Sequence, residues 1–471
     1  MTVETAIAII GGGIAGLSAA LRAGELGATA TVFEQSADEF YPCNSRMTGG
    51  VFHVAFNSVE APPSQLKQAI MSATYGAADG GLAELIGEEI GPAMGWLRRQ
   101  GAHLIRTQAQ PYYSAILAPP GLRKAGVHWK GYGGDRLLRN LAGKLEAHGR
   151  LERGVRIVDA QREPDGRFRL AGRRPDGDAL TIFTKAIIFA DGGFAGNQEL
   201  VKAHISSQPQ SLCARGAGTG LGYGVTIGGK LGAKLKDLDR FYGHVQARAA
   251  VKDQNLWPYP VVDHVATAAI VVDSAGRRFL DEGRGGVFIA NQIACAPDPL
   301  GSFVICDESI WQGPGRAHRL PPNPSLPRAG GDVVTADTLE HLAHRIGVPA
   351  ANLEATVDEH NRMLRGEGEP AVPRSRDRFA AWPVQDAPFH AIPVAAGITY
   401  TMGGLVIDAE AAVLDDGDRK IPGLFAAGAT TAGLEGGPFA GYTGGLSKSL
   451  VLGLKAAESA SLYAAGRGTP S

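Results

Sequence analysis

Three glycines and one carboxylate near the start of the chain have the types and spacing of a nucleotide-binding site. Gly11, Gly13 and Gly16 form a G-x-G-x-x-G pattern directly after an apolar run, and Glu34 ends a second apolar run. Gly11 allows a tight turn, Gly13 lets the backbone approach a pyrophosphate, and Gly16 lets a helix pack closely on a strand. A carboxylate at Glu34 is placed to accept hydrogen bonds from the hydroxyls of an adenosine ribose. These residues predict a dinucleotide site with phosphate at a helix N-terminus.

The elements that must position these residues form one strand, turn, helix and strand unit. The apolar run at 6–10 predicts the first strand, a small-residue pattern predicts a helix over 14–27, and the run at 29–33 predicts the second strand. A buried strand at 186–194 ends in glycines and offers a second backbone approach to the same ligand. The loop at 218–224 is also glycine-rich, but no apolar strand precedes it. We therefore expect a helix to start there, and no built-in NAD(P)H domain.

The chain returns to this unit at its C-terminal end. Strands are expected at 403–408 and 423–428, and a glycine-dense loop at 433–445 precedes a helix over 446–464. Small and hydroxyl residues at 43–53 suit backbone packed against an extended cofactor. A C-terminal segment that rejoins the N-terminal turn is what FAD needs, because FAD stretches between the first turn and the N-terminus of a last helix. The residues expected to bind FAD are Gly11, Gly13, Ile14, Ala15, Gly16, Glu34, Gln35, Asn44, Ser45, Thr48, Gly49, Gly50, Val155, Ala190, Asp191, Gly192, Asn197, Gly428, Ala429, Gly444, Gly445 and Leu446.

Composition indicates a folded chain of more than one domain that binds no nucleic acid. The 471 residues exceed what one core usually holds, and 46 Lys and Arg against 47 Asp and Glu give a net charge of -1. No apolar run approaches the ~20 residues of a membrane span, and the early first strand leaves no room for a signal peptide. Four scattered cysteines argue against a disulfide framework, iron–sulfur cluster, c-type haem or structural zinc. We expect a cytoplasmic protein without a metal.

Periodicity in the middle of the chain predicts an inserted domain. Helical patterns at 80–101 and 135–149 and a strand meander at 151–180 complete the first domain. From about residue 235 two strands and two helices surround a proline-rich run at 313–331, which predicts an α+β unit. The expected segments are the first part of a nucleotide-binding domain at 1–235, a capping or substrate domain at 236–386, and the rest of the first domain at 387–471.

Several motifs together resemble a known family. The chain carries GGGIAGLSAA, ADGGF with Asn197, GRRFLDE, LAHRIGVPAANLEATVDEHN, TMGGLVID, and IPGLFAAG followed by a glycine-rich loop. These resemble the FAD-dependent fumarate reductase / succinate dehydrogenase flavoprotein family, which includes 3-ketosteroid Δ1-dehydrogenases and tricarballylate dehydrogenase. The resemblance spans nearly the whole chain. It implies an α/β fold, with a Rossmann-like FAD-binding domain (GR2 type) and an inserted, mobile α+β capping (catalytic) domain, and with the substrate between them.

Departures from the family pattern narrow what the resemblance implies. Succinate dehydrogenases carry a flavin-linking histidine near the position of Arg46, and this chain has none there, so FAD should be bound non-covalently. Fumarate reductases have a histidine pair where this chain has Thr399 and Tyr400, and a carboxylate-binding arginine just before the last pair of glycines, where this chain has Tyr442-Thr443-Gly444-Gly445. The absence of both the histidine pair and the arginine argues against a C4-dicarboxylate substrate. The loop from Tyr442 to Gly445 is more similar to that of the ketosteroid and tricarballylate dehydrogenases.

The resemblance also suggests catalytic roles. We assign the stabilisation of an enolate oxygen to Tyr442 and the N–H of Gly445, since a phenol suits a ketone oxygen where an arginine would suit a carboxylate. Packing on the flavin edge is the alternative for Tyr442. Arg284 lies near the proton-donating arginine of fumarate reductases but not at the family spacing, so it could bind a substrate carboxylate instead. The catalytic base that removes the α-proton is not assigned to one residue. The other candidates are Tyr400, Tyr112 and Tyr113, with His53 and His244 as weaker options.

The resulting expectation is a flavin-dependent CH–CH oxidoreductase. It would desaturate a ketone or an oxo-carboxylic acid, such as a 3-ketosteroid or 4-oxocyclohexanecarboxylate, with the hydride passing to FAD N5 and the electrons to an external acceptor. Two alternatives are an enoate reductase like the fumarate reductases, which runs the reverse reaction, and a flavin-binding protein without turnover. The sequence does not determine the direction of the reaction, because the same protein scaffold serves both desaturation and reduction.

Overall fold

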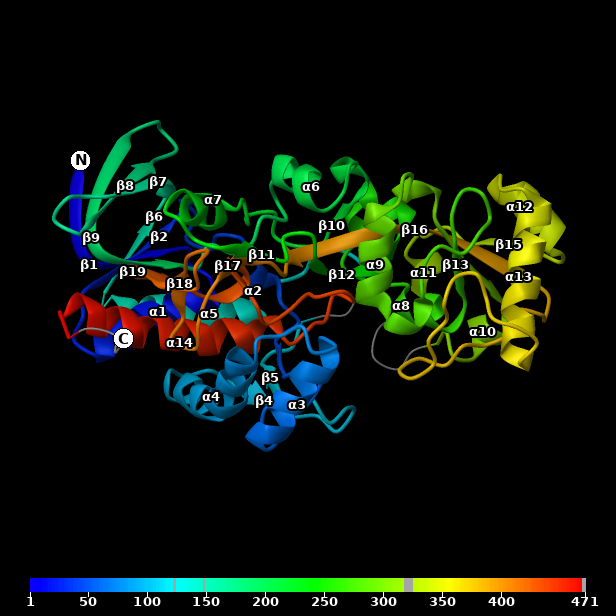
Figure 1. Cartoon of the computed structure of the whole chain (residues 1–471), viewed down its shortest axis with the longest axis horizontal. Helices are drawn as coiled ribbons and strands as arrows, with labels where there is room; N and C mark the ends of the chain where they lie inside the picture. Colours follow the sequence, from blue (N-terminus) through cyan, green and yellow to red (C-terminus); the bar gives the residue numbers. More distant parts are fainter. Residues whose placement is uncertain (122–123, 147–148, 317–324, 468–471) are drawn as a thin grey trace.

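The computed structural model describes residues 1–121, 124–146, 149–316 and 325–467, so the expected loop at 313–331 lies partly outside the described residues. The elements gather in two parts of an elongated molecule, and the long strand β16 (Phe389–Thr401) runs between them (Figure 1). Each part has its own large cluster of buried apolar side chains. The expected α/β architecture is confirmed.

The first part is built on a mainly parallel sheet with the strand order β18–β19–β9–β1–β2–β6. The central strand β1 (Thr2–Ile10) pairs in parallel with β2 (Ala30–Glu34) and β9 (Ala179–Phe189), and β9 pairs in parallel with β19 (Lys420–Ala426). The last four residues of β1 are fully buried, as expected for a strand inside a parallel sheet. A strand from the C-terminal end therefore lies in the same sheet as the N-terminal strand, which confirms the predicted return of the chain.

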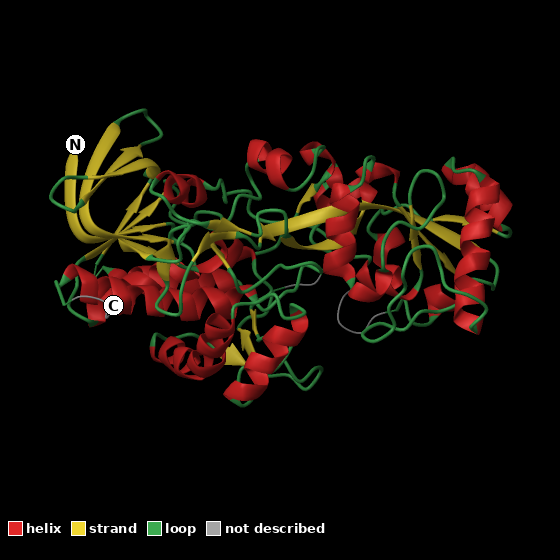
Figure 2. Ribbon diagram, viewed as in Figure 1, coloured by secondary structure: helices red, strands yellow, loops and turns green. Residues whose placement is uncertain are grey.

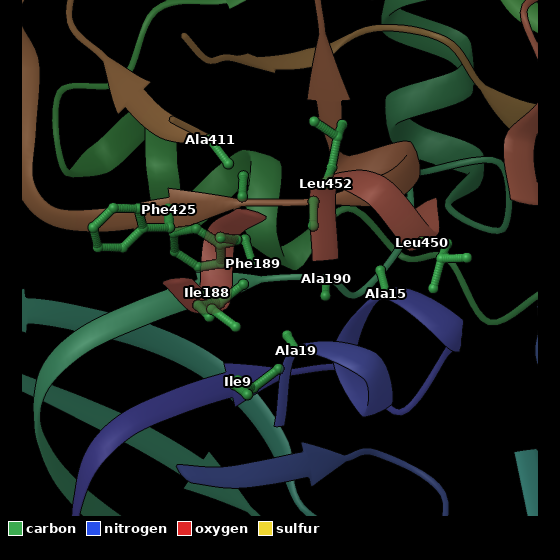
Figure 3. Close-up of a cluster of buried hydrophobic side chains, with 14 of the residues drawn as sticks. Ile9, Ala15, Ala19, Ile188, Phe189, Ala190, Ala411, Phe425, Leu450 and Leu452 are labelled. Carbon is green, nitrogen blue, oxygen red and sulfur yellow. The ribbon is translucent and has the colours of Figure 1, made fainter. Parts of the chain in front are cut away.

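Helices α1 (Ile14–Glu25) and α14 (Gly445–Ala464) pack together against one face of this sheet (Figure 2). Small side chains of α1 and leucines of α14 lie beside the apolar residues of β1, β9 and β19 (Figure 3). A Cβ on Gly16 would lie 2.0 Å from the carbonyl oxygen of Gly11, and a Cβ on Gly453 would lie 2.5 Å from a carbonyl oxygen of α1. Glycine at these positions therefore allows the close approach of α1 to its own turn and to α14.

The second part contains a sheet centred on β16. This strand pairs antiparallel with β12 (Phe241–Ala247), β14 (Phe303–Asp307) and β15 (Val334–Ala336), and in parallel with β10 (Cys213–Ala214). Strand β13 (Ile270–Val272) extends the sheet beyond β14. The sequence patterns predicted neither β12 nor β16. Because β16 follows residue 387, the C-terminal segment contributes strands to both parts of the molecule.

The remaining elements complete the two parts. The helices are α2 (Asn44–Met47), α3 (Pro63–Ala73), α4 (Gly80–Arg99), α5 (Gly133–Leu145), α6 (Gln198–His204), α7 (Tyr223–Lys230), α8 (Asp263–Ala268), α9 (Gly286–Cys295), α10 (Glu308–Gln312), α11 (Ser325–Arg328), α12 (Leu339–Ile346) and α13 (Ala350–Arg365). The strands are β3 (Val51–Phe52), β4 (Leu104–Ile105), β5 (Ala115–Leu117), β6 (Arg150–Arg153), β7 (Arg156–Arg162), β8 (Phe168–Arg173), β11 (Leu235–Lys236), β17 (Gly404–Val406), β18 (Ala412–Leu414) and β20 (Thr431–Ala432). Within the described ranges, no helix has the length and apolarity needed to cross a membrane.

Candidate functional site

A cavity of about 730 Å³ extends from the first glycine turn to β12 and β16. Its wall is formed by segments that are far apart in the sequence, including the turn before α1, the end of β9 and the start of α14. Most of the residues expected to bind FAD line it: Gly11, Gly13, Ile14, Ala15, Glu34, Gln35, Asn44, Ser45, Thr48, Gly49, Gly50, Val155, Ala190, Asp191, Gly192, Gly428, Ala429, Gly445 and Leu446.

The first turn presents backbone and one carboxylate to the cavity. Gly11 has a φ of +102°, and a Cβ there would lie 2.5 Å from the carbonyl oxygen of Ala190, so only glycine fits. The carboxylate of Glu34 accepts the N–H groups of Gly12 and Ser36, both at 3.0 Å. Burial raises its pKa, against the lowering effect of these backbone hydrogen bonds. This shielded carboxylate beside a glycine turn fits the adenosine half of FAD.

Three of the predicted cofactor residues lie away from the cavity wall. Gly16 packs α1 onto the turn. The side chain of Asn197 caps α6, since its Oδ1 accepts the N–H groups of Glu199 and Leu200. Gly444 donates its N–H to Glu435 at 3.3 Å. In the structure these residues shape the elements around the cavity, and their side chains or N–H groups are used within the protein.

Two phenols and a backbone N–H converge at the far end of the cavity. The Oη of Tyr442 accepts the N–H of Gly445 at 3.3 Å, and the ring of Tyr242 stacks on that of Tyr442 with centroids 3.9 Å apart. All three residues line the cavity. Burial raises the pKa of both phenols, so both keep their protons at neutral pH. The structure thus places the two groups that were assigned to an enolate oxygen side by side, with the N–H of Gly445 directed at the phenol oxygen of Tyr442.

A buried ion pair holds the turn that carries these donors. Glu435 and Lys448 are 3% and 1% exposed, and their charged atoms are 2.6 Å apart. Glu435 also accepts the N–H of Thr443 at 3.0 Å and the hydroxyl of Tyr400 at 3.1 Å. Burial acts to raise the pKa of Glu435, but Lys448 and these donors outweigh it and keep the pKa below its usual value. The charged Glu435 therefore fixes the backbone just before Gly445.

A tyrosine, a histidine and an aspartate form a hydrogen-bonded chain beside the phenols. The hydroxyl of Tyr242 lies 3.0 Å from Nε2 of His244, and Nδ1 of His244 lies 2.5 Å from Oδ2 of Asp263. The other oxygen of Asp263 accepts the N–H of Val245 at 2.7 Å, which fixes the carboxylate. Burial lowers the pKa of His244, although Asp263 acts to raise it, so the imidazole is neutral near pH 7. This series of hydrogen bonds can accept or deliver a proton at the oxygen of Tyr242.

The other predicted catalytic candidates also line the cavity. Arg284 donates to Asp281 at 3.2 Å and to the hydroxyl of Tyr75 at 2.8 Å, so its charge has a partner in the protein. Tyr113 packs against Tyr112, with ring centroids 4.6 Å apart. The hydroxyl of Tyr400 is used by Glu435. The ring of His53 packs edge-on against that of Tyr442, and burial lowers the pKa of His53 to about 4.

Sequence reasoning did not single out Tyr242, Asp263, Glu435 or Lys448. A signal existed for the first of these, because residues two apart on a strand face the same side. Tyr242 and His244 have this spacing on β12. Asp263 gave no such signal, since it reaches His244 from the first turn of α8.

Comparison with known proteins gives relatives that act on several small molecules. NADH:acrylate oxidoreductase of Vibrio harveyi is 27% identical over 376 residues, which are 77% of this chain and 35% of that protein. 4-Oxocyclohex-2-ene-1-carboxylate 5-dehydrogenase of Sinomonas cyclohexanicum is 27% identical over 350 residues, which are 68% of this chain and 58% of that protein. The chain therefore spans less than two thirds of the length of these relatives.

Solved structures show a shared fold. 3-Ketosteroid Δ1-dehydrogenase of Sterolibacterium denitrificans superposes with a TM-score of 0.73 at 19% identity, over 98% of this chain and all of that one. An open flavocytochrome c3 fumarate reductase superposes with a TM-score of 0.68 at 22% identity, over 98% of this chain and 79% of that one. These two neighbours show the shared fold alone, whereas the relatives above and the family match confirm the resemblance inferred from the sequence motifs. The FAD binding domain family matches residues 6–445, and together with a cavity whose glycine turn and carboxylate fit FAD, this match shows that the chain belongs to that family.

Proposed function

We propose that the protein is an FAD-dependent oxidoreductase that desaturates the CH–CH bond next to a ketone. The observation that carries the proposal is the convergence of the Tyr442 phenol and the Gly445 N–H on the wall of the FAD cavity. A neutral phenol that accepts the Gly445 N–H and donates its own O–H suits the oxygen of a ketone, which becomes negative only as the α-proton leaves. One such donor is worth about 2.7–4 kcal/mol of transition-state stabilisation in other enzymes.

The structure offers a path for the α-proton. Tyr242 is stacked on Tyr442, and in a ketone the α-hydrogen is only a few bonds from the oxygen that Tyr442 would bind. As the C–H bond breaks, the oxygen of Tyr242 takes that proton and passes its own to Nε2 of His244. Asp263 then stabilises the imidazolium. Bound FAD would supply the oxidant that accepts the β-hydride.

The relatives support both directions of this chemistry. Two are named as dehydrogenases of oxocyclohexane or oxocyclohexene carboxylates, whereas others are named as NADH:acrylate oxidoreductase, NADH:fumarate oxidoreductase or urocanate reductase. In the reductive direction the same phenol and histidine would deliver the proton to the α-carbon. Desaturation is our first proposal, because Tyr442 offers a neutral donor and no charge at the oxygen. In this proposal FAD is held non-covalently and an external acceptor reoxidises it.

Anaerobic mixing of the FAD-loaded protein with a panel of ketones tests the proposal. The panel contains oxocyclohexanecarboxylates, 3-ketosteroids and simple cyclic ketones, and the flavin absorbance near 450 nm is followed. Bleaching by at least one saturated ketone supports desaturation. Reoxidation of the reduced protein by the matching enones, without bleaching by any saturated ketone, would establish the reductase instead. A flavin that responds to neither set would contradict both.

A further inference from the structure

Arg215 is a buried cation on the wall of the same cavity. It directly follows β10 and is 8% exposed. Its Nη1 donates to the hydroxyl of Thr399 at 3.0 Å, its Nε donates to the carbonyl oxygen of Pro258 at 3.3 Å, and its guanidinium faces the ring of Tyr259 at 5.6 Å. These neighbours are neutral. They orient the guanidinium but leave its charge uncompensated.

In the part of the chain that the structure describes, the other buried cations all have a carboxylate partner. Among the described residues, the other lysine and arginine side chains that are equally buried pair as follows: Arg46 with Asp135, Arg278 with Glu282, Arg374 with Glu282, and Lys448 with Glu435. Within the same described ranges, no carboxylate lies within 4 Å of Arg215. An unpaired buried charge is strongly unfavourable, so a site of this kind calls for an anion from outside the chain.

The local backbone makes room for this arginine beside the proposed proton path. A Cβ on Gly397 of β16 would lie 3.3 Å from Cδ of Arg215, closer than most side-chain contacts. Gly397 pairs with His244 across the β12–β16 ladder, so Arg215 lies over the strand next to His244. The arginine is therefore close to the residues that would handle the α-proton of the substrate.

We propose that Arg215 binds the carboxylate of the substrate, which makes that substrate an oxo-carboxylic acid. A guanidinium and a carboxylate form short, charge-assisted hydrogen bonds, and the cavity supplies the low-dielectric surroundings that strengthen them. This inference rests on the proposed function for the ketone, but the anion site itself does not. Arg284, the carboxylate ligand considered from the sequence, already has Asp281 as its partner.

Equilibrium binding of redox-inert probes tests the anion site without turnover. The probes are cyclohexanecarboxylate and the neutral cyclohexanecarboxamide, titrated by calorimetry into the FAD-loaded wild-type protein and into Arg215→Met, Arg215→Lys and Arg284→Met. We expect the wild type to prefer the acid, Arg215→Met to lose at least tenfold in affinity for the acid with no change for the amide, and Arg215→Lys to retain part of the preference. Arg284→Met should bind the acid like the wild type. Melting curves check that each variant is folded.

Several results would overturn the anion site. One is a wild type that binds acid and amide equally, and another is an Arg215→Met variant that keeps its affinity for the acid. A third is an Arg215→Met variant whose FAD affinity or flavin spectrum changes while acid binding does not, because the arginine would then serve the cofactor. Loss of acid binding in Arg284→Met instead would move the site to that residue. If the acid binds through Arg215 but no ketone bleaches the flavin, the anion site stands and the proposed desaturation fails.

Discussion

At the reacting end of the cavity, burial favours the neutral forms of three phenols and two imidazoles. Burial raises the pKa of Tyr242, Tyr400 and Tyr442, and it lowers the pKa of His53 and His244. Each of these groups is therefore neutral near pH 7. A neutral donor favours an oxygen that gains charge during the reaction over one that is charged from the start.

Replacing Tyr442 by phenylalanine tests the donor role. The substitution removes only the hydroxyl, so Tyr442→Phe should bind FAD normally but be reduced by its substrate about 10²-fold or more slowly. Because the hydroxyl acts as charge develops, kcat and kcat/KM should fall together. Rapid mixing at saturating substrate measures the rate of flavin bleaching. Reduction at the wild-type rate would make Tyr442 a packing residue.

The hydrogen bonds that link Tyr242, His244 and Asp263 predict how kcat/KM changes with pH. His244 faces Tyr242, Asp263 and the charge of Arg215, and burial lowers its pKa below the usual value. Only the neutral imidazole can accept a proton, so kcat/KM should fall as the pH drops through this lowered pKa. Asp263 acts to raise this pKa, so Asp263→Asn should shift the acid limb to still lower pH and slow the reaction. The pH profile measures both effects. An unchanged profile in Asp263→Asn would contradict the relay.

Exchange of substrate hydrogen gives a second test of Tyr242 that needs no hydride transfer. In D₂O the protein should exchange the α-hydrogens of a cyclic ketone that lacks a transferable β-hydrogen, and Tyr242→Phe should do so at least tenfold more slowly. Proton NMR of the ketone follows the exchange. Equal exchange in the variant would leave Tyr242 without a role in proton transfer.

At the scale of elements, the N-terminus of α14 carries the reactive turn, and the ion pair beneath it holds that turn in place. Glu435→Gln keeps the shape of the side chain but leaves Lys448 buried without a counter-charge. Breaking such a pair costs about 3–5 kcal/mol, so we expect a large fall in the free energy of unfolding, measured by urea denaturation. Glu84→Gln is the matched control, since its pair with Lys67 is exposed and should cost less than about 1 kcal/mol. Similar losses in the two variants would contradict a structural role for Glu435.

The elements differ in how far sequence predicts them. The unit from β1 to β2 is local, and its glycines, apolar runs and terminal acid agree, so turn and site were both predictable. Helices α4, α12 and α13 follow from their apolar periodicity. Strands β12 and β16 carry glycine, proline and polar residues, and they are strands because they pair with each other across more than 140 residues. The Tyr242–His244–Asp263 chain depends on that pairing, which explains why sequence reasoning found the cofactor end of the cavity and missed the proton path.

At the scale of the whole molecule, the cofactor cavity joins the two ends of the chain. The first turn and the start of α14 line one cavity although they are more than 430 residues apart. A ligand that contacts both should stabilise the folded protein, because it binds the native state alone.

Precipitation with acid should release intact FAD, which absorption and chromatography identify in the supernatant. Flavin retained in the pellet would contradict non-covalent binding.

Removal of the Glu34 carboxylate, which is placed to bind the adenosine ribose, should weaken the binding of FAD. Glu34→Ala loses a carboxylate whose hydrogen bonds are worth about 1.5–3 kcal/mol each, so FAD should dissociate more readily and the melting temperature should fall toward that of the apoprotein. Fluorescence of the released flavin measures the affinity. Unchanged FAD affinity in Glu34→Ala would remove Glu34 from the cofactor site.

The position of Arg215 has a consequence for selectivity. Its charge lowers the proton affinity of His244 and of Tyr242. A bound carboxylate would cancel that effect, whereas a neutral ketone in the same cavity would leave it in place. An acidic substrate would thus raise the basicity of the groups that deprotonate it. A neutral ketone of similar shape would be deprotonated by weaker bases. Discrimination would then take place in the rate of the chemical step, and molecules without the acid group could occupy the cavity as inhibitors while reacting slowly.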